Sequence, residues 1–138
     1  MKIIKIKAHP LIFNNEVKIS LSIQEQLKVG FKWIFQYKEE LDSVAFHALV
    51  RYIDTESSLQ IMDAGITIIA EFADWKQKSH RNEDILNYQE TSNLVNYAMA
   101  FLSGYVFKGV EGTLLNSSFI PLLNTNDILK EIIIEEIK

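Results

Sequence analysis

Residues 29–75, VGFKWIFQYKEELDSVAFHALVRYIDTESSLQIMDAGITIIAEFADW, decide the fold. Large apolar side chains recur at every second position of residues 29–37 and of residues 44–52, and residues 59–75 add a longer apolar run. A period of two is typical of β-strands, whose successive side chains point to opposite faces. The polar turns KEELDS and DTESS separate the runs. Three long strands joined by short turns predict an antiparallel meander.

The segment before this meander also alternates. Ile4 and Ile6 alternate with lysines, and residues 17–23 alternate apolar with polar side chains, so we expect two further stretches of strand. His9-Pro10 interrupts the first stretch, and proline has no N–H to donate to a neighbouring strand. We therefore expect a bulge or a crossover at that point.

Length and composition limit the class of protein. A chain of 138 residues is expected to form a single domain, residues 1–138. It has no cysteine, which favours a reducing compartment, and its net charge of −4 argues against nucleic acid as a partner. No apolar window reaches the about 18 residues needed to insert in a membrane. The alternating N-terminus does not resemble a signal peptide, so the expected location is cytoplasmic.

Residues 91–107 contain no charged side chain and predict a helix with two apolar faces. One face is a broad stripe made of Leu94, Val95, Ala98, Met99, Leu102, Tyr105 and Val106. The opposite side carries smaller residues, namely Asn96, Ala100, Ser103 and Gly104. A helix on the surface of a monomer normally shows lysine and glutamate there. We therefore expect these four residues to form a subunit interface of a dimer or tetramer, or else to lie under a second layer of the same chain.

Capping residues predict where the helices begin and end. Ser79 or Asn82 is expected to cap a helix beginning near Glu83, and Gly109 and Gly112 fit a helix C-terminus that requires positive φ. Residues 114–123 are too apolar for a solvated loop and are expected to pack over the core as an extended strap.

A second cap precedes the C-terminus. Asn126 or Asp127 is expected to cap a final helix over residues 127–138, although residues 130–137 also fit a strand.

A search for chemistry gives no catalytic constellation. His9, His47 and His80 fall in different elements, and the single pair His80 and Glu83 is too little for a metal site. No zinc, calcium, phosphate-loop or nucleophile-elbow motif is present in the sequence. We therefore expect no catalytic residue, no metal and no cofactor.

The order of the expected elements resembles a known family. The closest local likeness is NLVNYAMAFLSGYVFKGVEGTLLNSSFIPLLNTNDI, residues 93–128, in which a helix with small residues leads to Gly112-Thr113 and an apolar stretch with Pro121. This segment and the order of the strands are similar to those of SecB-like proteins. The resemblance implies an α+β fold with an antiparallel four-stranded meander sheet and with a long helix and a C-terminal helix packed on one side.

The same resemblance implies a function. SecB-like proteins assemble into dimers or dimers of dimers, and the best-known members are export chaperones that hold unfolded proteins in apolar grooves, while others serve toxin–antitoxin systems. By matching position, the implied client groove is bordered by Leu11, Ile12, Phe13, Met99, Leu102 and Val106. Export members end in an acidic tail, whereas this sequence ends in an isoleucine-rich segment. The expected client is therefore narrower than that of an export chaperone.

The sequence thus predicts a non-enzymatic protein that oligomerises and binds apolar segments of a client or of one dedicated partner. Two alternatives stay open at this stage. One is an enzyme or small-ligand binder with a pocket between sheet and helix, with His47 or Asp63 inside it, and the other is a purely structural subunit.

Overall fold

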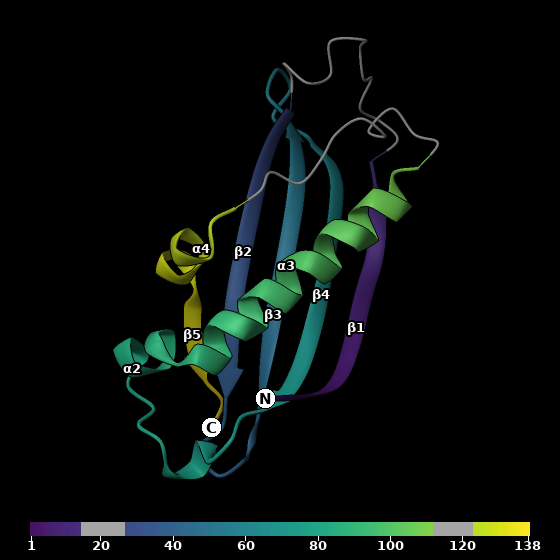
Figure 1. The fold of residues 1–138 in the computed structure, drawn as a ribbon. Helices are drawn as coiled ribbons and strands as arrows, with labels where there is room; N and C mark the ends of the chain where they lie inside the picture. Colours follow the sequence, from purple (N-terminus) through teal and green to yellow (C-terminus); the bar gives the residue numbers. More distant parts are fainter. Residues whose placement is uncertain (15–26, 112–122) are drawn as a thin grey trace.

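The computed structural model describes residues 1–14, 27–111 and 123–138. Its strands are β1 (Lys2–Phe13), β2 (Leu27–Tyr37), β3 (Ser43–Asp54), β4 (Gln60–Glu71) and β5 (Ile133–Glu136), and they form one sheet in the order β1-β4-β3-β2-β5. The long helix α3 (Gln89–Gly109) crosses one face of this sheet diagonally (Figure 1). The other helical elements are η1 (Trp75–Gln77), α2 (Asn82–Asn87) and α4 (Thr125–Glu131). The predicted α+β class is confirmed.

The predicted meander is confirmed as well. Strands β2, β3 and β4 pair antiparallel in sequence order, and β2 pairs with β3 without a register shift from Leu27 to Tyr37. Strand β1 adds to the far side of β4, with a register shift between His9 and Ile12, where the proline predicted a bulge. The predicted strand 17–23, Gly112 and most of the strap 114–123 lie outside the described residues.

The C-terminal segment differs from the preferred prediction. The last helix ends at Glu131, and residues 133–136 form a fifth strand, which pairs parallel with β2. The prediction of a helix through residue 138 is therefore wrong, and the sheet has five strands rather than four. The outer edge of β2 offers unpaired backbone groups, and β-branched isoleucines suit a strand. Residues 133–136 therefore pair with β2 instead of continuing the helix.

The predicted caps are also corrected. The backbone N–H of Asn126 donates to the side chain of Asn124 at 2.8 Å, so Asn124 caps α4 instead of Asn126 or Asp127. Helix α2 has Arg81 at its N-cap and no capping side chain. Gly109 is the last residue of α3 in a helical conformation, not a left-handed one. A Cβ atom there would overlap Leu11 Cδ1, so glycine allows β1 to approach the helix.

The core lies between α3 and the sheet face beneath it. Five side chains of the predicted stripe are completely or almost completely buried, namely Leu94, Val95, Ala98, Leu102 and Val106. They meet the alternate residues of the meander, which include the buried aromatic residues Trp33, Phe35, Phe46 and Tyr52. Each element alone would expose an apolar face, and packing the two faces together removes both from water.

A cluster of aromatic rings closes one end of this core. Trp75 follows β4 and is fully buried, with ring centroids of Phe35, Tyr37 and Phe72 at 5.9, 5.5 and 5.6 Å. The cluster anchors the connection between the sheet and α2. It also holds the beginning of α3 in place, because Tyr88 packs edge-on against the same ring at 6.4 Å.

We expect Trp75→Ala to lower the free energy of unfolding by about 3–5 kcal/mol, because it leaves a large cavity among rings that cannot collapse into it. Leu41→Ala is the matched control, since Leu41 is an exposed apolar residue in a turn, and it should change stability by less than about 0.5 kcal/mol. Urea denaturation measures both. Equal effects of the two substitutions would show that the cluster does not hold the fold.

Candidate functional site

The outer face of α3 has no charged residue between residues 91 and 107, and the described residues leave most of it exposed. The four residues predicted as a subunit interface lie there: Asn96, Ala100 and Gly104 are exposed, and Ser103 is half-exposed. Asn96 also contacts the last helix, because the Thr125 hydroxyl donates to its side-chain oxygen at 2.5 Å. Their placement on the surface agrees with the prediction, and their role in assembly stays a prediction.

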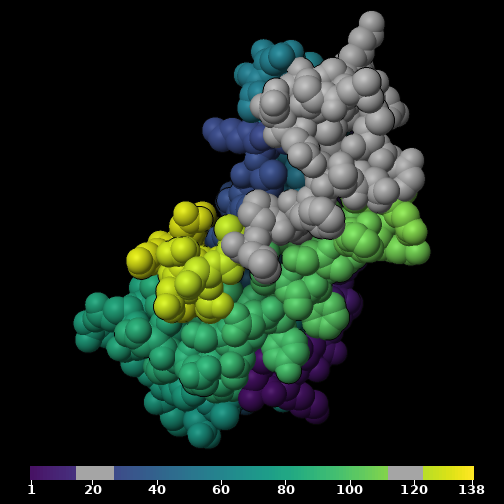
Figure 2. All heavy atoms as spheres, turned by 45° about the horizontal axis from the view of Figure 1, so that its top comes forward, coloured from purple at the N-terminus to yellow at the C-terminus, as the bar shows by residue number. Residues whose placement is uncertain are grey.

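Large aromatic residues stand beside this row of small ones. Tyr97, Phe101 and Phe107 are 49%, 43% and 59% exposed, respectively. Sequence reasoning included none of these three aromatic residues in the site. In Figure 2, α3 (green) runs across the front of the molecule beside β1 (purple), so this apolar surface adjoins the edge strand. Ile6 of β1 is also exposed.

The six residues predicted to border a client groove do not form one surface. Leu102 and Val106 are 0% and 1% exposed, so they belong to the core; the stripe of α3 faces its own sheet and leaves no groove there. Leu11 and Phe13 are half-buried on β1, and Leu11 reaches the end of α3 at Gly109. Ile12, between them, is 57% exposed.

Met99 is half-buried on α3. It lies six residues from Tyr105, whose hydroxyl donates to the His9 carbonyl at 2.5 Å, so the two side chains occupy different flanks of the helix. A client contact by Leu11, Ile12, Phe13 or Met99 stays a prediction.

The face of the sheet away from α3 carries a row of hydrogen bonds to which each strand contributes one residue. His9 Nε2 and His47 Nδ1 both lie 2.7 Å from the Thr67 hydroxyl oxygen. His47 Nε2 lies 2.7 Å from Gln36 Oε1, and Gln36 Nε2 donates to Glu135 at 2.9 Å. The row therefore connects the edge strand β1 to the edge strand β5.

One proton arrangement satisfies the whole row. The Gln36 oxygen can only accept, so His47 Nε2 donates to it, and a neutral His47 then accepts from the Thr67 hydroxyl through Nδ1. His9 Nε2 in turn donates to Thr67. The pKa of His47 is lowered from its ordinary 6.5, first by burial and then by the charge of His9, with Glu135 acting in the opposite direction. Burial thus favours the neutral ring that this arrangement requires.

The two residues considered for a pocket between sheet and helix do not lie between them. His47 and Asp63 both lie on the face away from α3. Asp63 accepts two hydrogen bonds from the Arg51 guanidinium, at 2.9 and 3.2 Å. Within residues 1–14, 27–111 and 123–138, no three histidine or acidic side chains gather in a group that could hold a metal ion.

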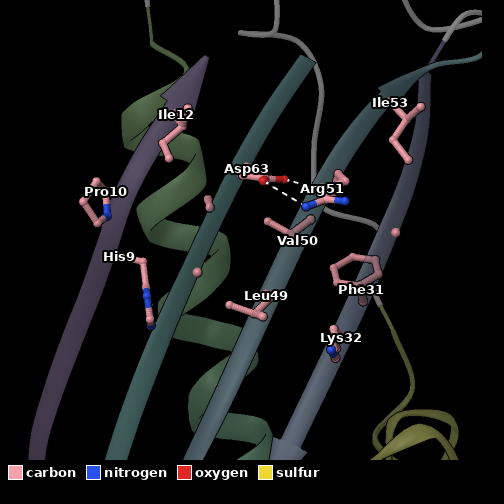
Figure 3. Close-up of a pocket in the computed structure, with 13 residues that line it drawn as sticks. His9, Pro10, Ile12, Phe31, Lys32, Leu49, Val50, Arg51, Ile53 and Asp63 are labelled. Atoms are coloured by element: carbon pink, nitrogen blue, oxygen red, sulfur yellow. Dashed lines mark hydrogen bonds and ion pairs between the residues drawn. The ribbon is translucent and has the colours of Figure 1, made fainter. Parts of the chain in front are cut away.

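A hollow of about 600 Å³ opens on this same face. Figure 3 shows its side chains in front of the strands, with α3 behind them. Its apolar side chains include Ile12, Leu49 and Ile53, Lys32 supplies positive charge, and Arg51 is paired with Asp63. Gly30 and Gly65 also line it, and the absence of a side chain at Gly30 makes room there.

Comparison with known proteins shows a similarity at the level of the fold. No protein-family model matches the sequence, and no curated protein matches it significantly. Among solved structures, the fold is similar to that of the Mycobacterium tuberculosis SecB-like chaperone Rv1957, solved in complex with a ChAD peptide from the HigA1 antitoxin Rv1956. The TM-score is 0.53 at 9% sequence identity, and the match covers 89% of this chain and 84% of that chain.

At such low identity the similarity supports a distant SecB-like fold and says nothing direct about activity. The fold implied by the order of elements in the sequence is thereby supported. None of the described helices is long and apolar enough to cross a membrane.

The lowered pKa of His47 makes stability depend on pH. Below about pH 6.5 the unfolded chain binds a proton at this histidine more readily than the folded chain does, so stability falls as pH falls. We therefore expect the stability advantage of the native protein over His47→Gln to be largest above pH 7 and smaller at pH 5. Urea denaturation of both proteins at a series of pH values measures it. An advantage that grows as the pH falls would contradict the neutral ring.

Proposed function

We propose that this chain is a non-enzymatic, SecB-like chaperone or protein-interaction module, which self-associates and binds apolar segments of a client or dedicated partner. The outer face of α3 carries the proposal. It exposes large aromatic side chains on a helix that is already packed on its other side, and it has no charge between residues 91 and 107. Contiguous apolar surface of this kind marks an interaction site.

The small residues suit assembly between copies of the chain. Asn96, Ala100 and Gly104 recur every four residues, so they form a line along the outside of the helix. A Cβ atom built at Gly104 meets no described atom within 4 Å, so the described residues leave room for a second helix to approach closely. The homo-oligomer, a dimer or tetramer, would then bury this line against its symmetry copy.

The aromatic residues suit binding of a client. Tyr97 and Phe101 are one helical turn apart, on the flank of α3 nearer β1, where Ile6 is also exposed. Rings of this size provide apolar contact area at a small cost in conformational entropy. The client segment would lie along the junction of α3 and β1, with Leu11 and Phe13 at one end. Leu102 and Val106 support this surface from the core.

We expect Gly104→Arg to dissociate the oligomer, because a charged and bulky side chain then stands where the second helix packs. Light scattering at micromolar concentration measures the mass, and circular dichroism should show an unchanged fold, since Gly104 is exposed. Lys108→Ala, at the exposed end of the same helix, is the control. A native protein that is monomeric at these concentrations would refute the assembly.

We expect Phe101→Asp to weaken the binding of an unfolded, apolar and uncharged polypeptide by about tenfold or more, since it places a charge within the client surface. Fluorescence anisotropy of the labelled polypeptide measures the affinity. Phe101→Leu should bind nearly as well as the native protein, because it keeps the surface apolar. Equal affinities of the native protein and Phe101→Asp would locate the client elsewhere.

A further inference from the structure

The sheet face that α3 leaves uncovered is basic, although the chain as a whole has a net charge of −4. Antiparallel partners share a face, so the register places Lys5 and Lys7 of β1, and Lys28 and Lys32 of β2, on this side. Among the residues that the structure describes, none of these four lysines forms an ion pair. Arg51 and Asp63 on the same face neutralise each other. Glu71 of β4 and Glu135 of β5 also lie on this face. The four lysines outnumber these two carboxylates, so the surface has an excess of positive charge.

The lysines flank a floor in which apolar side chains lie beside the hydrogen-bonded pair His47 and Thr67 and beside the Arg51–Asp63 ion pair. Between the pair on β1 and the pair on β2 lie the half-buried side chains of Ile34, Leu49, Ile53 and Ile69. Three strand spacings separate β1 from β2, so this floor is about 14 Å wide. From Ala45 to Ile53 on β3 it is about 27 Å long. The two lysine pairs mark diagonally opposite ends of this area.

The hollow lies in this floor. At Gly30 an added Cβ atom would meet no described atom within 4 Å, so no described residue fills the space above the strand. At Gly65 an added Cβ atom would come 2.5 Å from Leu49 Cδ2, so there the glycine is needed for packing. One large side chain of a ligand, entering above Gly30, would fill space that no described residue of the sheet uses.

An extended segment would not suit this face. The strands already pair with their neighbours, so a strand laid flat on the sheet would leave its own backbone N–H and C=O groups unpaired. A helix satisfies these groups internally and needs a floor about 10–12 Å wide. Five turns of helix span the 27 Å of floor at 1.5 Å per residue, or about 18 residues.

We propose that this face docks an amphipathic helix of a partner protein, one whose apolar stripe is flanked by aspartate and glutamate. Its carboxylates meet the lysines at the two ends of the floor, and one large apolar side chain enters the hollow above Gly30. The inference rests on the proposed protein-binding function and names a second contact for it, on the opposite face of the sheet from the aromatic surface of α3.

The test uses a fluorescent helical peptide of about 18 residues with a leucine stripe flanked by glutamates. The matched peptide has lysine in place of every glutamate. The acidic peptide should bind at least about tenfold more tightly, even though the whole protein is acidic, and its affinity should fall when salt is raised from 50 to 500 mM. Equal binding of the two peptides, or tighter binding of the basic one, would overturn the proposal.

Variants locate the contact. The double substitution Lys7→Glu and Lys32→Glu should lower the affinity for the acidic peptide by about tenfold or more. Lys108→Glu, at the end of α3, should leave this affinity within about twofold of the native value. Gly30→Val fills the hollow without a clash and suits a strand, so it should bind the peptide less tightly while unfolding at a temperature no lower than that of the native protein. A Gly30→Val protein that binds as the native protein does would remove the hollow from the site.

The same peptide separates this inference from the proposed function. Loss of acidic-peptide binding in Phe101→Asp, with the lysine variants unaffected, would place the peptide on α3 and overturn the docking site. If the uncharged polypeptide does not bind but the acidic peptide binds in a lysine-dependent way, the docking site stands and only the apolar-client function falls.

Discussion

The burial of the apolar stripe of α3 against the aromatic face of the meander is the contact on which the rest of the structure depends. The stripe includes Leu94, Ala98 and Leu102, and the sheet presents Trp33, Phe35 and Phe46 to it. Since these faces cover each other, the strongest apolar pattern in the sequence serves the fold and not a ligand. Two broad surfaces of the described residues remain for binding: the outer face of α3 and the opposite face of the sheet.

Periodicity predicted much of the fold because it follows directly from backbone geometry. The period-two runs gave β2, β3 and β4, and the uncharged run 91–107 gave α3. The fifth strand could not be predicted in the same way. Residues 130–137 suit a helix or a strand nearly equally, and the choice depends on the free edge of β2, almost a hundred residues earlier in the chain. The N-cap of α4 was predicted two or three residues too late, because several adjacent polar residues can cap a helix. Only the backbone geometry selects Asn124.

The candidate site was harder to predict, for two physical reasons. The apolar stripe of α3 was assigned both to the core and to a client groove, and Leu102 cannot serve as both. The hydrogen-bonded row is not visible in the sequence, because His9, Thr67 and Glu135 come together only through strand register. The basic face is equally hidden, since net charge averages over the whole surface, while strand alternation gathers Lys5, Lys7, Lys28 and Lys32 on one face.

Gly30 is the position at which the needs of the fold and of a binding site can be separated. Glycine weakens a strand, because it loses more backbone entropy on folding and offers no side chain for packing. At Gly65 and Gly109 a neighbouring leucine occupies the place of the missing side chain, which accounts for glycine there by packing alone. At Gly30 no described residue does so, and β-branched residues would stabilise the strand. Packing among the described residues therefore does not account for glycine at this position, whereas the proposed helix would use the hollow above it.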